Sequence, residues 1–576
     1  MDFLISSDKI YSEWDYIKKI PLHLYFRKGV VSEREFIYDT IKLTVLADAN
    51  ISFINKIKQE PSKLNIKKNI NSLNNGFVLL YNKNSDELFL FTDIFGFYPV
   101  FSIIKSKNEF KISTDFRHLI KFSSAEVNAS SVIDLLLFNY IINEKTLLKD
   151  IVRLKGGSIL TLKSDSVTIV NTNNFADNLI IPEKYEKFLP NEAGQILSTE
   201  IGAESSPHLP SVLTMSGGFD SRVLLAAVHH AGLDISTFTF GQPGSIEQET
   251  ISPFINSFST NHTFFRLDDN YLNGINNHLI DFLEFNLDNP SAQDLVHYSY
   301  IKNNLINCNL IAGYMGGELI TGQSLGAGVT FTEFAYHLLN TTDKDKIADY
   351  FNQEIEKTGL FDIKAVSRYK EAYLTDISNY FYDTDKLHII KFLLNEKYSK
   401  FFGRLNSLFR NHSNLIVPFM SHDYLLYLLN SKISILHTGL LNNPPTVTIK
   451  ARMAYSKMIE YLNKPLADTN LDRLYRVKDL SHYYRLPCAI VAYLLNHLFD
   501  RNKKKFLRPH HYDLWYTDLI SKHITPSIYE QLGGLIKKDL YLSSDQYTSL
   551  SSGTKKVYAN LLGLKLGLEI IHVRNA

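Results

Sequence analysis

Short apolar runs separated by polar turns fill the first third of the chain. The runs at 76–81 and 88–92 are separated by the polar segment 82–87, which is the spacing of a β-hairpin. A second pair of strands is predicted around 101–104 and 110–114. These patterns predict an antiparallel sheet in this part of the chain.

A helix at 131–142 and a strand at 156–162 complete the pattern of this region. Strands that pair with their neighbours, together with a few helices, indicate an α+β domain. A polar segment punctuated by proline follows at about 174–190. We therefore expect a first domain at 1–180 and a second domain at 190–576.

Strands alternate with helices after this segment, which predicts a doubly wound and mostly parallel sheet. Such sheets bind ligands at the carboxyl ends of their strands. The predicted elements are strands at 211–215, 235–240, 263–267 and 309–312, with helices at 222–230 and near 247–258. From residue 332 onward the spacing is mainly helical, with helices predicted at 348–356, 385–396, 422–429 and 450–462.

The most informative stretch is the turn Ser216-Gly-Gly-Phe-Asp-Ser221, between a predicted strand and a predicted helix. Free N–H groups and the helix dipole make such a turn an anion site. Gly217 and Gly218 allow a phosphate to approach the backbone, and the hydroxyls of Ser216 and Ser221 add donors. Asp220 would repel a bare phosphate, so it implies a Mg²⁺ ion between carboxylate and phosphate.

Composition excludes several classes of function. The 576 residues suffice for two to four domains, and a net charge of +1 gives no field that favours nucleic acid or an acidic membrane. The two cysteines, Cys308 and Cys488, form neither a disulfide framework nor a metal-ligand spacing, which favours a cytoplasmic location. The N-terminus has an acid where a signal peptide needs a basic region, and no apolar run reaches transmembrane length. The basic run 501–505 is interpreted as a solvated helix end.

Six stretches, in chain order, resemble the motifs of one family. The turn 216–221 resembles the SGGxDS pyrophosphate loop of N-type ATP pyrophosphatases, and it is not a Walker P-loop. Five further stretches resemble DRFGxRPL (93–100), FASExKAL (113–119), TLFxGIxxLPPG (146–157), GxGxDELFGG (313–322) and RxPFLD (417–423). Together they resemble the class B asparagine synthetases and their relatives, the β-lactam and lasso-peptide macrolactam synthetases.

The resemblance implies an Ntn-hydrolase-like α+β domain at 1–180, with a synthetase domain of the α/β ATP pyrophosphatase (adenine nucleotide α-hydrolase-like) type and a helical C-terminal region at 190–576. Glutamine-using members carry a nucleophilic Cys at position 2, but this chain has Asp2 and no cysteine before Cys308. A carboxylate is a poor nucleophile toward an amide. We therefore expect no glutamine hydrolysis.

The family chemistry implied by the resemblance is attack of a carboxylate on the ATP α-phosphate, which gives an acyl-adenylate and pyrophosphate. An amine then displaces AMP. The resemblance assigns the pyrophosphate to Ser216, Gly217, Gly218 and Ser221, and the metal to Asp220. It assigns the adenine and ribose to Met215, Phe240, Gly241, Ala312 and Gly313; Phe240 could equally be a plain core aromatic. ATP and Mg²⁺ are the expected cofactors.

The turn at 313–322 departs from the family pattern. Tyr314 stands where asparagine synthetases have Glu and β-lactam synthetases have Tyr, which there helps to deprotonate the attacking amine. Gly317 stands where the family has a second Mg²⁺-binding Asp. Glu318, the next residue, is the candidate substitute as metal ligand and catalytic group, unless one carboxylate suffices.

Four basic residues have open roles. Lys478 is the best-placed candidate for the lysine that stabilises the negative charge of the reaction intermediates, and Lys450 is the runner-up. Arg222 could reach the pyrophosphate or be an exposed residue of the first helical turn. Arg404 matches a family arginine near the acceptor side, or is a structural ion-pair residue.

We expect an ATP-dependent, AMP-forming carbon–nitrogen ligase that acts on a specialised carboxylate, to form a macrolactam, a lactam, or an amide of a peptide or sugar acid. The alternatives are an ammonia-dependent asparagine-synthetase-like enzyme and a non-catalytic ATP-binding scaffold. The expected partner is a small-molecule or peptide substrate, with no nucleic acid and no membrane. The sequence leaves open a homodimer or a complex with other pathway proteins.

Overall fold

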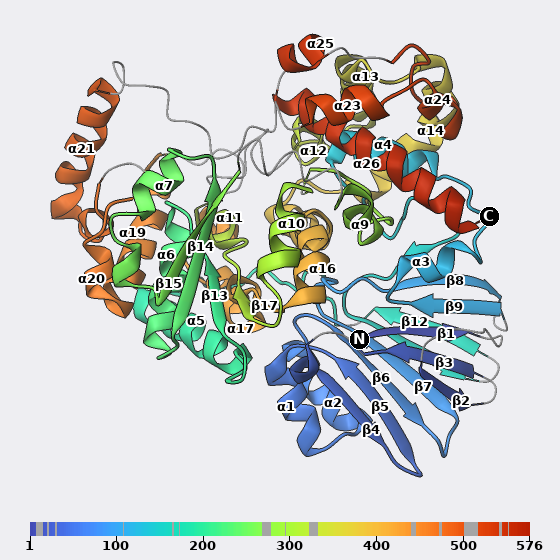
Figure 1. Ribbon diagram of the computed structural model, residues 1–576, viewed down its shortest axis with the longest axis horizontal. Coiled ribbons are helices and arrows are strands. Elements are labelled where there is room, and N and C mark those ends of the chain that lie inside the picture. Colours follow the sequence, from blue (N-terminus) through green and yellow to red (C-terminus); the bar gives the residue numbers. More distant parts are fainter. Residues whose placement is uncertain are drawn as a thin grey trace.

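The structure is a computed structural model with mixed α/β architecture and several sheets (Figure 1). It describes residues 1–6, 15–19, 22–28, 31–106, 109–163, 166–171, 173–267, 278–293, 295–321, 332–438, 445–471, 475–499, 516–540, 544–550 and 552–575. Gly322 of the predicted turn and the basic run 501–505 lie outside these residues.

Two six-stranded antiparallel sheets form the N-terminal region. The first has the order β10 (Val152–Arg153), β8 (Phe101–Ser106), β9 (Glu109–Ser113), β1 (Asp2–Ser6), β3 (Leu22–Arg27) and β2 (Asp15–Lys19). The second has the order β12 (Ser166–Asn171), β11 (Ser158–Lys163), β7 (Glu87–Thr92), β6 (Phe77–Asn82), β5 (Leu43–Asp48) and β4 (Glu35–Asp39). The predicted hairpin is confirmed, because β6 and β7 pair from Phe77 with Thr92 to Asn82 with Glu87.

The two sheets share a core because alternate residues of each strand point to opposite faces. Phe77 and Leu79 of β6 pack in the same cluster as Phe3 of the first sheet, and the Phe3 and Phe77 rings are 4.7 Å apart. Val78 and Leu80 face the other way, into a separate cluster with α1 (Ile51–Gln59) and α2 (Lys63–Asn69). The result is a layer of helices on a pair of stacked sheets.

A five-stranded parallel sheet follows the N-terminal region along the chain, as the alternation of strands and helices predicted. Its order is β15 (Asn261–Arg266), β14 (Ile235–Gly241), β13 (Ser211–Thr214), β16 (Asn309–Ile311) and β17 (Asn414–Ile416). The strand order reverses between β13 and β16, and such a switch point is where this kind of sheet opens a crevice. α5 (Pro190–Glu204), α6 (Phe219–His230) and α19 (Pro445–Leu462) pack against one another beside the sheet (Figure 1).

The rest of the chain after the N-terminal region is mainly helical, as predicted. The helices are α7 (Ile246–Ile251), α9 (Leu279–Glu284), α10 (Leu295–Asn304), α11 (Gly316–Thr321), α12 (Glu333–Leu338), α13 (Lys344–Thr358), α14 (Ile363–Tyr380), α15 (Lys386–Phe392), α16 (Phe402–His412), α17 (His422–Leu429), α18 (Ile435–Thr438), α20 (Lys464–Ala467), α21 (Leu486–Phe499), α23 (Thr517–His523), α24 (Ser527–Gln531), α25 (Ser544–Ser549) and α26 (Ser552–Asn575). A π-helical segment, η5 (Leu393–Phe401), joins α15 to α16. Within the described ranges, no helix has both the length and the apolar character needed to cross a membrane.

The C-terminal helix α26 returns to the N-terminal region, where it packs on α3 (Phe116–Ile120) and α4 (Ala129–Phe138) (Figure 1). Asn560 Nδ2 donates to the carbonyl of Leu135 at 3.1 Å. One apolar core contains both Leu4 of the first sheet and Ile571 of α26. The two predicted domains are therefore packed together over a continuous core.

Candidate functional site

The loop between β13 and α6 lies at one end of the candidate site. β13 ends at Thr214, and α6 begins at Phe219. Gly218, the residue before the helix, has an extended backbone and contributes no side chain to cap the first turn. The N–H groups of a helix start with no capping side chain are the usual donors to a bound anion.

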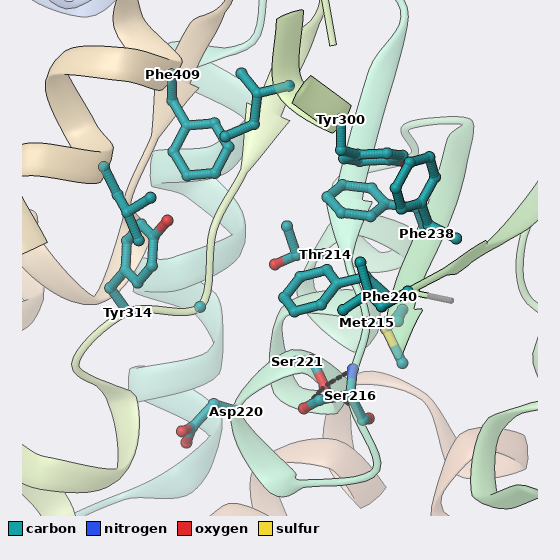
Figure 2. A pocket seen from close by; sticks show the side chains of 15 residues that line it. Thr214, Met215, Ser216, Asp220, Ser221, Phe238, Phe240, Tyr300, Tyr314 and Phe409 are labelled. Atoms are coloured by element: carbon teal, nitrogen blue, oxygen red, sulfur yellow. Dashed lines mark hydrogen bonds between the residues drawn. The ribbon is translucent and has the colours of Figure 1, made fainter. Parts of the chain in front are cut away.

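Two serines hold the loop in shape. Ser221 Oγ accepts a hydrogen bond from the amide of Ser216 at 3.1 Å and donates to the carbonyl of Ser216 at 3.0 Å, and the two hydroxyls are 3.1 Å apart (Figure 2). The amide of Gly218 donates to Ser216 Oγ at 3.4 Å. The hydroxyls that the sequence predicted as phosphate donors thus also shape the loop.

A cavity of about 270 Å³ opens beside this loop, at the switch point of the parallel sheet. Ser216, Asp220 and Ser221 line its polar end (Figure 2). The remainder of the wall is largely aromatic, with contributions from Phe238, Phe240, Phe265, Tyr300, Tyr314 and Phe409. The cavity therefore joins an anion-binding loop to an apolar slot.

The other residues predicted to bind the nucleotide fall into two groups. Met215, Phe240 and Gly313 line the cavity. Gly241 and Ala312 are buried in the strand ends, where their backbone groups bond to neighbouring segments of the sheet. The residues of the first group can contact a ligand. The residues of the second group hold in place the strand ends from which the first group extends.

The carboxyl groups of Asp220 and Glu318 lie close enough to repel each other. Asp220 is in the first turn of α6, and Glu318 is in the first turn of α11. Burial, with the neighbouring Glu318 carboxylate as a second cause, raises the pKa of Asp220 to about 7. Burial also raises the pKa of Glu318. Two neighbouring carboxyl groups whose pKa values are raised in this way ionise more readily when a cation is bound between them, so the pair favours cation binding.

Two glycines allow α11 to approach Asp220. A Cβ atom on Gly316 would lie 2.7 Å from Asp220 Oδ1 and 2.8 Å from Tyr455 Oη, so a side chain does not fit there. A Cβ on Gly317 would lie 3.3 Å from Asp220 Oδ2. Position 317 therefore faces the Asp220 carboxylate, although it supplies no ligand of its own.

Lys397 of η5 is a buried cation that the sequence analysis did not identify. Burial lowers its pKa to about 8, and the Glu318 carboxylate opposes this shift. No local sequence signal distinguishes this lysine, although π-helical segments are frequent at functional sites. Asp220, Glu318 and Lys397 thus form a charged group beside the loop.

The residues present fit a Mg²⁺ ion with most of its shell made by water and phosphate. The hydroxyls of Tyr398 and Tyr424 are buried without a hydrogen-bond partner in the described part of the chain, whereas the Tyr455 hydroxyl contacts the Asp220 carboxyl. Burial and the nearby Asp220 carboxylate raise the pKa of all three tyrosines. Orphaned hydroxyls of this kind are suited to metal-bound waters. Among the described residues no group of three His, Cys, Asp or Glu side chains forms a denser metal cage.

Tyr314 follows β16 and lines the cavity on the same side as Asp220 (Figure 2). Its ring packs on Phe402, with centroids 5.5 Å apart. The next residue, Met315, has a φ of 71°, which is unfavourable for a non-glycine residue. Strained backbone of this kind is concentrated at functional sites.

Arg222 is not the exposed residue of the first helical turn that one sequence interpretation expected. Its side chain is fully buried. Nη1 donates to Thr469 Oγ1 at 2.5 Å, and the guanidinium lies 4.5 Å from the centre of the Phe254 ring. Thr469, in the segment after α20, and Phe254 thus contact the guanidinium inside the protein.

The remaining candidate cations lie outside the lining of the cavity. Lys478 is partly exposed and forms an ion pair with Asp468. Lys450 is exposed on α19. Arg404 is buried, and its Nη1 donates to the carbonyl of Asn139 at 3.0 Å.

Comparison with known proteins gives no assignment for this arrangement: no family model matches the chain, and no curated protein matches it significantly.

Proposed function

We propose that this protein is an ATP-dependent synthetase that activates a carboxylate as an acyl-adenylate and forms an amide from it, releasing pyrophosphate and AMP. The observation that carries the proposal is the Ser216–Ser221 loop at the switch point of a parallel sheet, with the Asp220 carboxyl beside Glu318. This combination places N–H groups that can bind phosphates beside carboxyl groups that can bind a cation.

The shape of the cavity supports a nucleotide as the ligand. A volume of about 270 Å³, with one polar end and an aromatic wall, suits a planar base attached to a charged group. Phe240 is then a wall of the base slot, and the loop holds the β and γ phosphates as the leaving group. Because the β and γ phosphates leave together as pyrophosphate, the bond that breaks is the one between the α and β phosphates.

The two carboxyl groups supply the metal site in this proposal. Asp220 and Glu318 would hold Mg²⁺, which neutralises charge on the departing pyrophosphate. Lys397 balances the charge of Glu318 from the side of η5. Gly317 leaves the site one carboxylate short of the family pattern, and Glu318 takes that role from the next position.

The acceptor side of the reaction is assigned to Tyr314. Its position on the cavity wall suits removal of a proton from an attacking amine. The N-terminal pair of stacked sheets is proposed to be an Ntn-hydrolase-like scaffold that has lost its glutaminase reaction, because position 2 is Asp2. Amine supply would then come from the substrate itself or from a free amine.

The test is ATP–pyrophosphate exchange with a panel of amino acids, short peptides and sugar acids, together with identification of the nucleotide product. We expect exchange and AMP with the correct carboxylate, and loss of at least about 10²-fold in Asp220→Ala, the usual scale of a lost charged catalytic contact. Asp234→Ala, an exposed acid just after α6, is the matched control and should retain activity.

Three outcomes would contradict the proposal in different ways. Formation of ADP and phosphate would exclude the pyrophosphatase chemistry. Tight binding of α,β-methylene ATP without exchange on any carboxylate would favour a non-catalytic ATP-binding scaffold. Use of free ammonia as the only amine would favour the ammonia-dependent alternative.

A further inference from the structure

A carboxylate already contacts the loop to which the phosphates are assigned. Oε2 of Glu247 accepts a hydrogen bond from the amide of Gly217, at 2.5 Å. Glu247 belongs to α7, which follows β14, the neighbour of β13 in the sheet. A negative group therefore already uses one N–H of the loop.

The contact is held in a rigid frame. The amide of Met215 donates to the carbonyl of Phe238 at 2.8 Å, and Thr239 Oγ1 donates to the carbonyl of Met215 at 3.0 Å. The start of the loop is thus fixed to β14, from whose end Glu247 approaches. Gly217 is buried, so its amide has little access to water as an alternative acceptor.

We propose that Glu247 is a specificity-determining residue, which makes the loop select metal-complexed phosphates over free polyanions. This proposal rests on the proposed function, since it concerns the same loop. A free pyrophosphate or metal-free ATP must take the Gly217 amide while a carboxylate remains within a few ångströms. Mg²⁺ offsets that repulsion, because it neutralises most of the charge that enters the site.

The placement of the charged groups supports this selection of metal-complexed phosphates. Asp220 and Glu318 lie together at the start of α6 and α11, where a cation is favourable. Glu247 contacts the amide of Gly217, in the turn that precedes α6. A ligand that reaches the loop therefore meets carboxylates from three elements, and only a ligand that carries its own positive charge is well matched.

The experiment measures the Kd of pyrophosphate by calorimetry, with excess Mg²⁺ and with a chelator, for the full-length wild-type protein and its variants. Glu247→Gln removes the charge and keeps an acceptor for Gly217, and Glu247→Ala removes both. Glu249→Gln makes the same chemical change at an exposed position two residues along α7 and serves as the control.

We expect the wild type and Glu249→Gln to bind metal-free pyrophosphate far more weakly than its Mg²⁺ complex. In Glu247→Gln and Glu247→Ala, binding of metal-free pyrophosphate should tighten by about tenfold or more, because a like charge is removed at short range. Binding of the Mg²⁺ complex should change by less than about threefold, so the selectivity for the complex falls.

Unchanged selectivity in both Glu247 variants would overturn the proposal. Weaker binding of the Mg²⁺ complex by tenfold in these variants would also overturn it, and would make Glu247 a metal ligand. Failure of the wild type and all variants to bind pyrophosphate in either form is a different result, because it refutes the proposed function of the loop itself.

Discussion

At the scale of single residues, burial makes the negative charge of the Asp220 carboxyl unfavourable in the folded protein. Its pKa of about 7 in place of 3.8 means that the folded protein favours the protonated form. Below pH 3.8 the folded and unfolded chains both carry a protonated Asp220, so there is no penalty. As pH rises toward 7, only the unfolded chain ionises, and the free energy of unfolding falls.

The Asp220→Asn variant should therefore be more stable than the wild type at pH 8 without Mg²⁺. The difference between a pKa of 3.8 and one of about 7 corresponds to about 4 kcal/mol, and the partial exposure of the residue reduces this to an expected gain of about 1–3 kcal/mol. Urea unfolding at pH 8 measures the gain. It should shrink near pH 4, and an equal gain at both pH values would exclude titration of Asp220 as its cause.

Tyr314→Phe should separate the two half-reactions of the proposed synthetase. Its hydroxyl is assigned to the amine step, so pyrophosphate exchange should persist. Product formation should fall by about 10²-fold or more, the usual size of a general-base contribution. Parallel assays of exchange and product check this. If product formation is unchanged, Tyr314 is a wall of the cavity and nothing more.

At the scale of elements, several boundaries differ from those that the pattern predicted. α6 begins at Phe219 rather than near Arg222, so Asp220 and Ser221 belong to its first turn. α4 spans Ala129–Phe138 rather than 131–142, because Asn139 adopts a left-handed conformation with φ 70° that ends the helix. The predicted helix 385–396 changes to π-helix at Leu393.

Arg222 ties α6 to the segment that follows α20, through Thr469, and to Phe254. Arg222→Ala should lower the free energy of unfolding by about 2–4 kcal/mol, as for other large-to-small changes in a core. Arg222→Met, which keeps most of the volume, should cost less than half as much. Urea denaturation checks both. If Arg222 bound pyrophosphate instead, both variants would lose nucleotide affinity with little change in stability.

At the scale of the whole molecule, buried charges connect the N-terminal sheets to the second half of the chain. Arg410 of α16 donates to Asp48 Oδ1 at 2.6 Å and to the carbonyl of Asn75 at 2.8 Å, and it lies 4.1 Å from the centre of the Tyr98 ring. Breaking a buried pair of this kind is strongly destabilising. Buried polar contacts therefore join the N-terminal sheets to α16.

Glutamine should not be hydrolysed at a rate above that of the boiled protein. Asp2 forms an ion pair with Arg27 at 2.7 Å and lines a polar cavity of about 70 Å³. Neither the Asp2 carboxylate nor the Arg27 guanidinium is an effective nucleophile toward an amide. Asp2→Cys should not restore the reaction, because the cavity is lined by charged groups that are paired with one another, such as Arg117 and Asp115. An ammonia-release assay measures both proteins, and ammonia from the wild type would refute the expectation.

Local pattern and turn chemistry determined the strands and the loop of this protein. The β6–β7 hairpin, the strands β13 and β14, and the Ser216–Ser221 turn depend on neighbouring residues, so the sequence by itself predicted them. The three-residue strand β17 was missed, because Asn414-Leu-Ile is too short to show a period and becomes a strand only by pairing with β16.

Only the tertiary structure decided what surrounds the loop. Lys397 lies 176 or more residues from the loop in sequence, yet its charge acts on Glu318 beside Asp220. Glu247 reaches Gly217 because β13 and β14 are neighbours in a parallel sheet. Such contacts follow from strand order and helix packing, which join residues that are distant along the chain. No local pattern encodes them, and the electrostatic character of the site depends on them.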